Sequence, residues 1–192
     1  MEESTWIHAP IERCFYLSLN IDLHQDSTAQ TKERAVAGVT SGLIGLGERV
    51  TWRGRHFGIM LSHTSEITAY EAPTFFEDVM VSGVFRSFRH RHRFYADANG
   101  TVMEDRLEFT APIPLLGRMI EVLVLKRYLG SFLRERNAFI KQIAESEEWR
   151  KYLDGSVDTR DATPADGRAR GRRDGKVLLR GSQIVAPQPP HL

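Results

Sequence analysis

A strict alternation of aromatic or apolar with charged side chains over residues 88–109 constrains the fold of this chain more than any other feature. From Phe88 to Phe94, phenylalanine and histidine alternate with arginine, and residues 101–109 alternate in the same way. Such a two-residue period is typical of a β-strand with two unlike faces. Residues 97–100 read Asp-Ala-Asn-Gly, and Asn-Gly is the strongest short hairpin signal. The sequence therefore predicts an antiparallel hairpin here.

Pairing Ala96 with Thr101 across the turn sets the register of this hairpin. The predicted inner face then consists of four opposed pairs: Phe94 with Met103, His92 with Asp105, His90 with Leu107, and Phe88 with Phe109. Opposed Cβ atoms on one face lie about 5 Å apart, so His92 and Asp105 are within reach of a hydrogen bond. A register slipped by one residue would turn both histidines to solvent. Two imidazoles and a carboxylate among aromatic rings predict the lining of a partly polar cavity rather than a dry core.

Further segments upstream have the pattern of strands joined by short links. They cover residues 5–8, 33–39, 48–55, 57–70 and 75–81. With the hairpin they make about seven strands, which predicts one antiparallel meander. Pro10 and the helical spacing of Ile11, Phe15 and Leu19 predict a helix after the first strand, and residues 20–31 a second short helical turn.

Residues 38–47 contain four glycines among apolar side chains. A phosphate-binding loop would continue with Gly-Lys-Ser or Gly-Lys-Thr, whereas this loop ends Gly-Glu-Arg. Two interpretations stay open: a strand connection that needs positive φ, or a mobile apolar flap over a pocket.

The period changes to that of a helix at Leu115. Apolar residues recur every three or four positions from there to about Tyr152, which predicts an amphipathic helix entered through Pro112 and Pro114. At 1.5 Å per residue it would run about 50 Å, enough to cross the concave side of a sheet. Residues 154–192 are rich in Gly, Asp, Arg and Pro and predict a disordered charged tail. The expected division is a domain over residues 1–153 and a tail over residues 154–192.

Composition narrows the class of protein. The chain is 41% hydrophobic and 27% charged, which suits one soluble domain. Its net charge is only +1, whereas a nucleic-acid-binding domain is expected to carry a strongly basic surface. No apolar run approaches the roughly 20 residues that span a bilayer. A single cysteine, Cys14, and an acidic N-terminus without signal-peptide features favour the cytoplasm. The sequence does not determine the oligomeric state.

The element order of strand, two short helices, six strands and a long helix is the helix-grip arrangement. In this order the chain resembles the SRPBCC (START-like) superfamily, in particular its small bacterial ligand-binding and polyketide cyclase/dehydrase-like members. The resemblance covers roughly Glu3 to Tyr152. It is carried by Ala9-Pro10-Ile11-Glu12, Ile21-Asp22-Leu23-His24, Gly38-Val39-Thr40-Ser41-Gly42, Val50-Thr51-Trp52-Arg53, and Phe88-x-His90-x-His92-x-Phe94 with the following Asp105.

This resemblance implies an α+β helix-grip fold, in which a seven-stranded antiparallel sheet wraps around the long C-terminal helix. It also implies a deep cavity between sheet and helix that holds a hydrophobic or amphipathic small molecule. Relatives often have tryptophan at the position of Phe88, so this chain keeps the aromatic character but alters the pocket shape. The superfamily includes carriers, sensors and enzymes, so the fold alone does not choose the chemistry.

Ten residues are expected to contact the ligand: Val50, Trp52, Phe88, His90, His92, Phe94, Met103, Asp105, Leu107 and Phe109. The expected function is that of a carrier or sensor for a lipid, quinone or polyketide-like molecule, with the imidazoles orienting a ligand carbonyl or hydroxyl. Alternatively, the polar side chains only satisfy one another in a cavity wall.

A third interpretation is a polyketide cyclase or dehydratase in which His92, held by Asp105 and helped by His90, is the acid or base. The His-x-His pattern with a carboxylate opposite also resembles a metal triad. No further ligand is evident in the sequence, so neither a metal nor a cofactor is expected.

Overall fold

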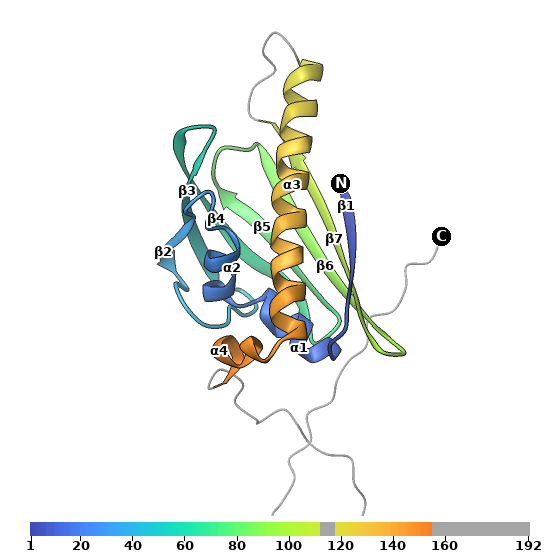
Figure 1. Cartoon of the computed structure of the whole chain (residues 1–192). Coiled ribbons are helices and arrows are strands. Elements are labelled where there is room, and N and C mark those ends of the chain that lie inside the picture. Colours follow the sequence, from blue (N-terminus) through green and yellow to red (C-terminus); the bar gives the residue numbers. More distant parts are fainter. Residues whose placement is uncertain (112–117, 155–192) are drawn as a thin grey trace, which may run out of the picture. The chain divides into compact units, whose positions relative to one another are not determined.

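The structure is a computed structural model that describes residues 1–111 and 118–154. Seven antiparallel strands form one sheet in the order β1-β7-β6-β5-β4-β3-β2, so that consecutive strands pair and β1 joins the edge beside β7 (Figure 1). The strands are β1 (Glu2–Ile7), β2 (Arg34–Gly38), β3 (Arg49–His56), β4 (Ile59–Glu71), β5 (Phe75–Ser82), β6 (Ser87–Asp97) and β7 (Gly100–Thr110). The predicted α+β helix-grip arrangement is confirmed.

The register predicted for the β6–β7 hairpin is confirmed at every pair. Ala96 pairs with Thr101, His92 with Asp105, and the other three predicted pairs hold as well. The turn itself differs in detail, because Asp97 pairs with Gly100 and the two loop residues are Ala98 and Asn99. Gly100 is therefore the first residue of β7, where a Cβ would overlap the carbonyl oxygen of Ile7 on β1.

Two short helices fill the corner between β1 and β2. They are α1 (Ile11–Ser18) and α2 (Ile21–Ser27). Pro10 precedes the first helical residue with φ −58°, and the Asn20 side chain caps α2 by accepting a hydrogen bond from the Leu23 amide. Phe15 of α1 is fully buried against Phe94 of β6, with ring centroids 5.5 Å apart, and anchors the core at this end of the sheet.

The glycine-rich loop serves as a strand connection. Gly38, Gly42 and Gly47 all have positive φ. The loop is tied to α2, because the Gly42 amide donates to Asp22 Oδ2 at 2.8 Å and the Ile21 amide donates to the Gly42 carbonyl. These bonds favour the connection over the flap.

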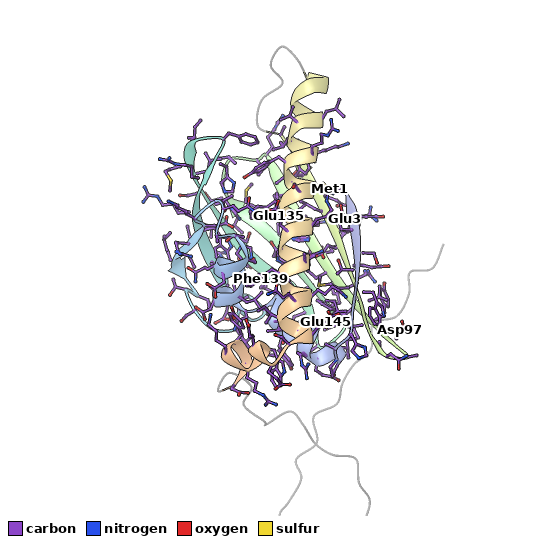
Figure 2. The ribbon with its side chains drawn as sticks, viewed as in Figure 1. Met1, Glu3, Asp97, Glu135, Phe139 and Glu145 are labelled. Atoms are coloured by element: carbon purple, nitrogen blue, oxygen red, sulfur yellow. The ribbon has the colours of Figure 1, made fainter. Side chains whose placement is uncertain are left out.

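The long helix α3 (Arg118–Glu145) runs along β1, α1 and α2 (Figure 1). Arg134 donates to Glu3 at 2.8 Å and Lys141 donates to the Trp6 carbonyl at 2.6 Å, so β1 and α3 are joined side by side (Figure 2). No helix in the described part of the chain is both long and apolar enough to cross a bilayer.

The predicted single helix to Tyr152 is wrong at its C-terminal end. The chain leaves α3 at Glu145 and continues as a 3-10 turn, η1 (Glu147–Trp149), and a short helix, α4 (Arg150–Leu153). The Ser146 side chain accepts a hydrogen bond from the Glu148 amide, which starts the new turn. The predicted helix start at residues 112–117 and the predicted tail beyond Asp154 lie outside the described residues.

Candidate functional site

A cavity of about 380 Å³ lies between the concave face of the sheet and α3. That volume falls in the range of small-molecule pockets, roughly 300–1,000 Å³. Most of its wall is apolar, and its apolar residues include Val50, Trp52, Leu61, Phe88, Leu107, Leu129 and Phe132. α3 packs on β1 and the short helices, and the cavity separates it from the central strands.

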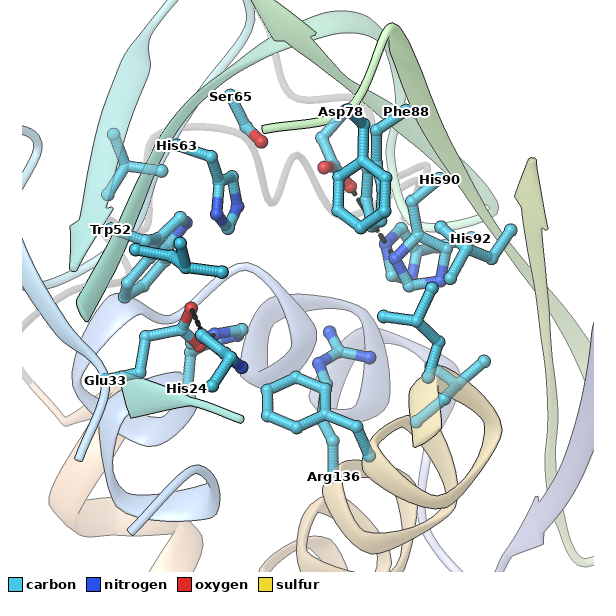
Figure 3. Close-up of a pocket in the computed structure, with 18 of the residues that line it drawn as sticks. His24, Glu33, Trp52, His63, Ser65, Asp78, Phe88, His90, His92 and Arg136 are labelled. Carbon is cyan, nitrogen blue, oxygen red and sulfur yellow. Dashed lines mark hydrogen bonds and ion pairs between the residues drawn. The ribbon is translucent and has the colours of Figure 1, made fainter. Parts of the chain in front are cut away.

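Five of the six histidines that the structure describes line this cavity. They belong to two groups on opposite walls (Figure 3). The Glu33 cluster consists of Glu33, His24, His56 and His63. The Asp105 cluster consists of Asp78, His90, His92 and Asp105. A mostly apolar chamber therefore has a polar patch at each side.

Asp105 on β7 lies behind the two histidines of β6. Its Oδ1 is 2.6 Å from His92 Nδ1 and 3.0 Å from His90 Nε2. Its Oδ2 accepts a 2.7 Å hydrogen bond from Asn137 Nδ2, and Arg136 Nη1 lies 3.7 Å from Oδ1. Burial opposes ionisation of Asp105, but the electrostatic interaction with His92 and the contacts with His90 and His92 outweigh it and hold the pKa well below its usual range. Asp105 is therefore a buried carboxylate.

Asp78 on β5 approaches the same histidines from the cavity side. Its Oδ2 is 3.3 Å from His92 Nε2 and 3.9 Å from His90 Nδ1. Burial raises the pKa of Asp78, but the His92 hydrogen bond and the electrostatic interaction with His90 outweigh it, so the pKa is lowered. Burial and the neighbouring His92 lower the pKa of His90. The two imidazoles thus lie between two carboxylates.

The Glu33 cluster is built from consecutive elements, because His24 lies on α2, Glu33 directly before β2, His56 at the end of β3 and His63 on β4. Glu33 Oε2 is 3.0 Å from His24 Nε2, and Glu33 Oε1 is 3.8 Å from His56 Nε2. His56 Nδ1 is 2.7 Å from the hydroxyl of Tyr128 on α3. Burial opposes ionisation of Glu33, but the hydrogen bond and the electrostatic interaction with His24 keep its pKa below the usual value. Burial lowers the pKa of His63, so a neutral imidazole is favoured there.

Six of the ten predicted ligand contacts line the cavity: Val50, Trp52, Phe88, His90, His92 and Leu107. The other four lie elsewhere. Phe94 and Met103 are fully buried in the core beside α1, Asp105 lies behind the histidines, and Phe109 packs on Phe85 at the far end of the hairpin. Phe94 and Met103 do not line the cavity, because Phe15 and Ser18 of α1 cover this end of the sheet. That the six residues bind a ligand stays a prediction.

Sequence reasoning missed most of the polar wall. The missed residues are Glu33, His24, His56, His63, Asp78 and Arg136. Asp78 could have been predicted from the sequence, because an aspartate inside a strand that neighbours a His-x-His strand is a candidate partner of the histidines. The structure pairs His24 with Glu33, which lies outside the short helical segment of His24.

No family model matches the sequence, and no curated protein matches it. Solved structures share the fold. The chain is similar to the protein TTHA0849 from Thermus thermophilus, with 18% identity and a TM-score of 0.59, over 73% of this chain and 95% of that one. It is also similar to a START superfamily protein from Mycobacterium smegmatis, with 11% identity and a TM-score of 0.57, over 76% and 96% of the two chains.

A third similar structure is the di-domain ARO/CYC StfQ from the steffimycin biosynthetic pathway. The identity is 14% and the TM-score 0.59, over 76% of this chain and 50% of that two-domain protein. At identities of 18% or less, the similarity to these structures shows a shared fold and no more. The predicted START-like resemblance is confirmed at that level.

Proposed function

We propose that this chain, which has the helix-grip fold of START-like proteins, binds an amphipathic small molecule between its sheet and α3. The observation that carries the proposal is the cavity of about 380 Å³, which is mostly apolar and has one polar cluster on each side. Apolar burial contributes about 25 cal/mol per Å², so the wall supplies affinity while the clusters orient the ligand.

The charges of the wall narrow the ligand class. Glu33, Asp78 and Asp105 each have a lowered pKa and are ionised near neutral pH. Arg136 is engaged by the Ser18 carbonyl and lies near Asp105, so it offers little free positive charge. Anionic groups are therefore repelled, whereas hydroxyl and keto groups find donors and acceptors on the imidazoles. Among lipids, quinones and polyketide-like aromatics, an uncharged ring system with oxygens at both ends fits best.

The test uses a neutral fluorescent probe, N-phenyl-1-naphthylamine, because the natural ligand is unidentified. Trp52→Ala and Phe88→Ala should each weaken its binding about tenfold, since tenfold corresponds to about 1.4 kcal/mol of lost burial. Arg91→Ala is the matched control, because Arg91 bonds to Glu77 and Glu108 on the outer face. An equal loss in all three variants would contradict the proposal. Native mass spectrometry of protein from its own host would give the mass of a retained ligand.

A second candidate function is acid–base catalysis on such a ligand. It is favoured by the 2.6 Å contact between Asp105 and the cavity-lining His92 and by the fold shared with an ARO/CYC protein. A His92–carboxylate pair is suited to moving a proton at a bound carbonyl or hydroxyl. With poly-β-keto substrates, His92→Ala and Asp105→Asn should lose turnover while the probe still binds. An unchanged product yield in both variants would remove this candidate.

The buried, unpaired Cys14 supports a reducing compartment such as the cytoplasm.

A further inference from the structure

Each imidazole of β6 has one nitrogen directed at Asp105 and the other at Asp78. Asp105 Oδ1 contacts His92 Nδ1 and His90 Nε2, so His92 Nε2 and His90 Nδ1 are left on the Asp78 side. Asp78, His90 and His92 come from neighbouring strands, since Asp78 of β5 pairs with His90 of β6. All three line the cavity.

The spacing of these atoms is close to that of a metal coordination shell. One ligand atom from each of Asp78, His90 and His92 lies within 4.8 Å of the others. Bonds of about 2.1 Å to nitrogen and oxygen place neighbouring ligand atoms about 3.0 to 3.4 Å apart in octahedral or tetrahedral geometry. The Asp78–His92 separation of 3.3 Å already matches, and the Asp78–His90 separation of 3.9 Å needs a side-chain shift of roughly half an ångström.

The groups behind the triad are a second and independent observation. Metal-binding histidines almost always direct their other ring nitrogen to a carboxylate or carbonyl, which fixes the tautomer. Asp105 faces both histidines in this way, and Asn137 holds its other oxygen. The buried atoms His90 Nε2, His92 Nδ1 and Asp105 Oδ1 nonetheless make no well-directed hydrogen bond among the described residues. Both nitrogens nevertheless lie 2.6 to 3.0 Å from Asp105 Oδ1, so Asp105 stands behind both rings, on the side away from Asp78.

We propose that Asp78, His90 and His92 bind one divalent first-row transition-metal ion, and that Asp105 positions the two imidazoles. Two imidazoles and one carboxylate suit Zn²⁺, Fe²⁺, Co²⁺ or Ni²⁺ rather than Mg²⁺ or Ca²⁺, which prefer all-oxygen sites. The negative charges of Asp78 and Asp105 together balance the two positive charges of the ion. Three protein ligands leave at least one coordination position open, and it faces the cavity, where a keto or hydroxyl oxygen of the bound molecule would reach the ion.

This assignment reverses the expectation of no metal site. The sequence offered only the His-x-His pattern and Asp105, whereas the third ligand lies on another strand. The assignment does not rest on the proposed organic ligand.

The test is titration of the full chain, purified without a histidine tag and stripped with a chelator, with Co²⁺ and Zn²⁺ alone. We expect one ion per chain, visible Co²⁺ bands shaped by nitrogen and oxygen ligands, and displacement of Co²⁺ by Zn²⁺. Asp78→Asn and His90→Gln should weaken Zn²⁺ binding at least 100-fold. Asp105→Asn should weaken it 10- to 100-fold while one ion per chain still binds, because it acts through the imidazoles.

The matched control is His63→Gln, which removes another cavity imidazole outside the triad. It should leave Zn²⁺ affinity unchanged. A variant that fails to fold is recognised by far-UV circular dichroism, and Asp78→Asn is the mildest change because its side chain is partly exposed. A Zn²⁺-dependent rise in the melting temperature should occur in the wild type and be absent in Asp78→Asn.

Two results would overturn the proposal: no saturable Zn²⁺ binding by the wild type, or an equal loss in His63→Gln and His90→Gln. If the apo protein still binds N-phenyl-1-naphthylamine in that case, only the metal site fails and the proposed function stands.

Discussion

At the scale of single residues, Glu33 shows how the fold accommodates a buried charge. Its side chain is 3% exposed, and imidazoles from α2 and β3 contact both of its oxygens. His63 of β4 adds a nearby ring, and Tyr128 of α3 holds His56 from behind. A buried carboxylate without such partners would cost several kcal/mol. The cluster therefore fixes the geometry of one cavity wall.

This arrangement predicts an acid-sensitive contribution to stability. Because the folded-state pKa of Glu33 lies below its unfolded value of 4.5, its contribution is complete above that pH and is lost as pH falls through the folded pKa. Glu33→Gln should lower the free energy of unfolding by about 1.5–3 kcal/mol at neutral pH, and the loss should shrink on acidification. Urea midpoints from about pH 6 to about pH 3 would measure this. The exposed Glu104→Gln is the control, and parallel pH profiles for Glu33→Gln and wild type would contradict the prediction.

At the scale of elements, the β6–β7 turn and β1 are packed so closely that only glycine fits at residue 100. A Cβ there would overlap the backbone of Ile7 rather than a movable side chain. Gly100→Ala should therefore push β1 away from β7 and lower the free energy of unfolding by about 1–3 kcal/mol. Gly45→Ala is the matched control, because its Cβ would meet only the end of the Glu48 side chain at 3.4 Å. Equal urea midpoints for the two variants would contradict this account.

Elements defined by local alternation were predictable from the sequence. The β6–β7 register followed from periodicity alone, because a one-residue slip would have exposed both histidines. The end of α3 was not predicted, because the apolar spacing continues through Ile143 to Tyr152. The capping signal was present in Ser146-Glu147-Glu148, where the serine side chain starts a new turn, but the periodicity outweighed it.

The candidate site was predictable only where it lies on that hairpin. His90, His92 and Asp105 share one face of two adjacent strands, so local reasoning brings them together. His56 of β3 and Tyr128 of α3, in contrast, are 72 residues apart and meet only because the helix lies across the cavity from β3, which no spacing in the sequence encodes. Long-range pairs of this kind need the tertiary structure.

At the scale of the whole molecule, the two halves of α3 differ in how many hydrogen bonds and ion pairs join them to the rest of the described chain. Polar bonds to the rest of the described chain concentrate from Arg134 onwards: Arg134 to Glu3, Asn137 to Asp105, Lys141 to Trp6, and Ala144 to Arg13. Nearer its N-terminal end, Leu125, Leu129 and Phe132 of α3 line the cavity, and Tyr128 bonds to His56 across it.

This asymmetry predicts where a bound molecule leaves. Tyr128→Phe removes the hydrogen bond that joins α3 to β3 beside the cavity, so dissociation of N-phenyl-1-naphthylamine should quicken several-fold, and its association should change little. Stopped-flow fluorescence would separate the two rates. Arg134→Ala, which cuts the bond to Glu3 on the other side of the helix, is the control. Faster release in Arg134→Ala than in Tyr128→Phe would contradict the prediction.

Phe57 lines the cavity and is nevertheless 61% exposed, and its ring lies 4.5 Å from that of Tyr128, so this pair marks the rim of the chamber. The opposite end is sealed by α1 and the buried Phe15. A long molecule would therefore insert one end and leave the remainder trailing past the rim, over the exposed Ile59 and Leu123. The interior volume would then limit the width of the head group that is accepted, and not the length of its tail.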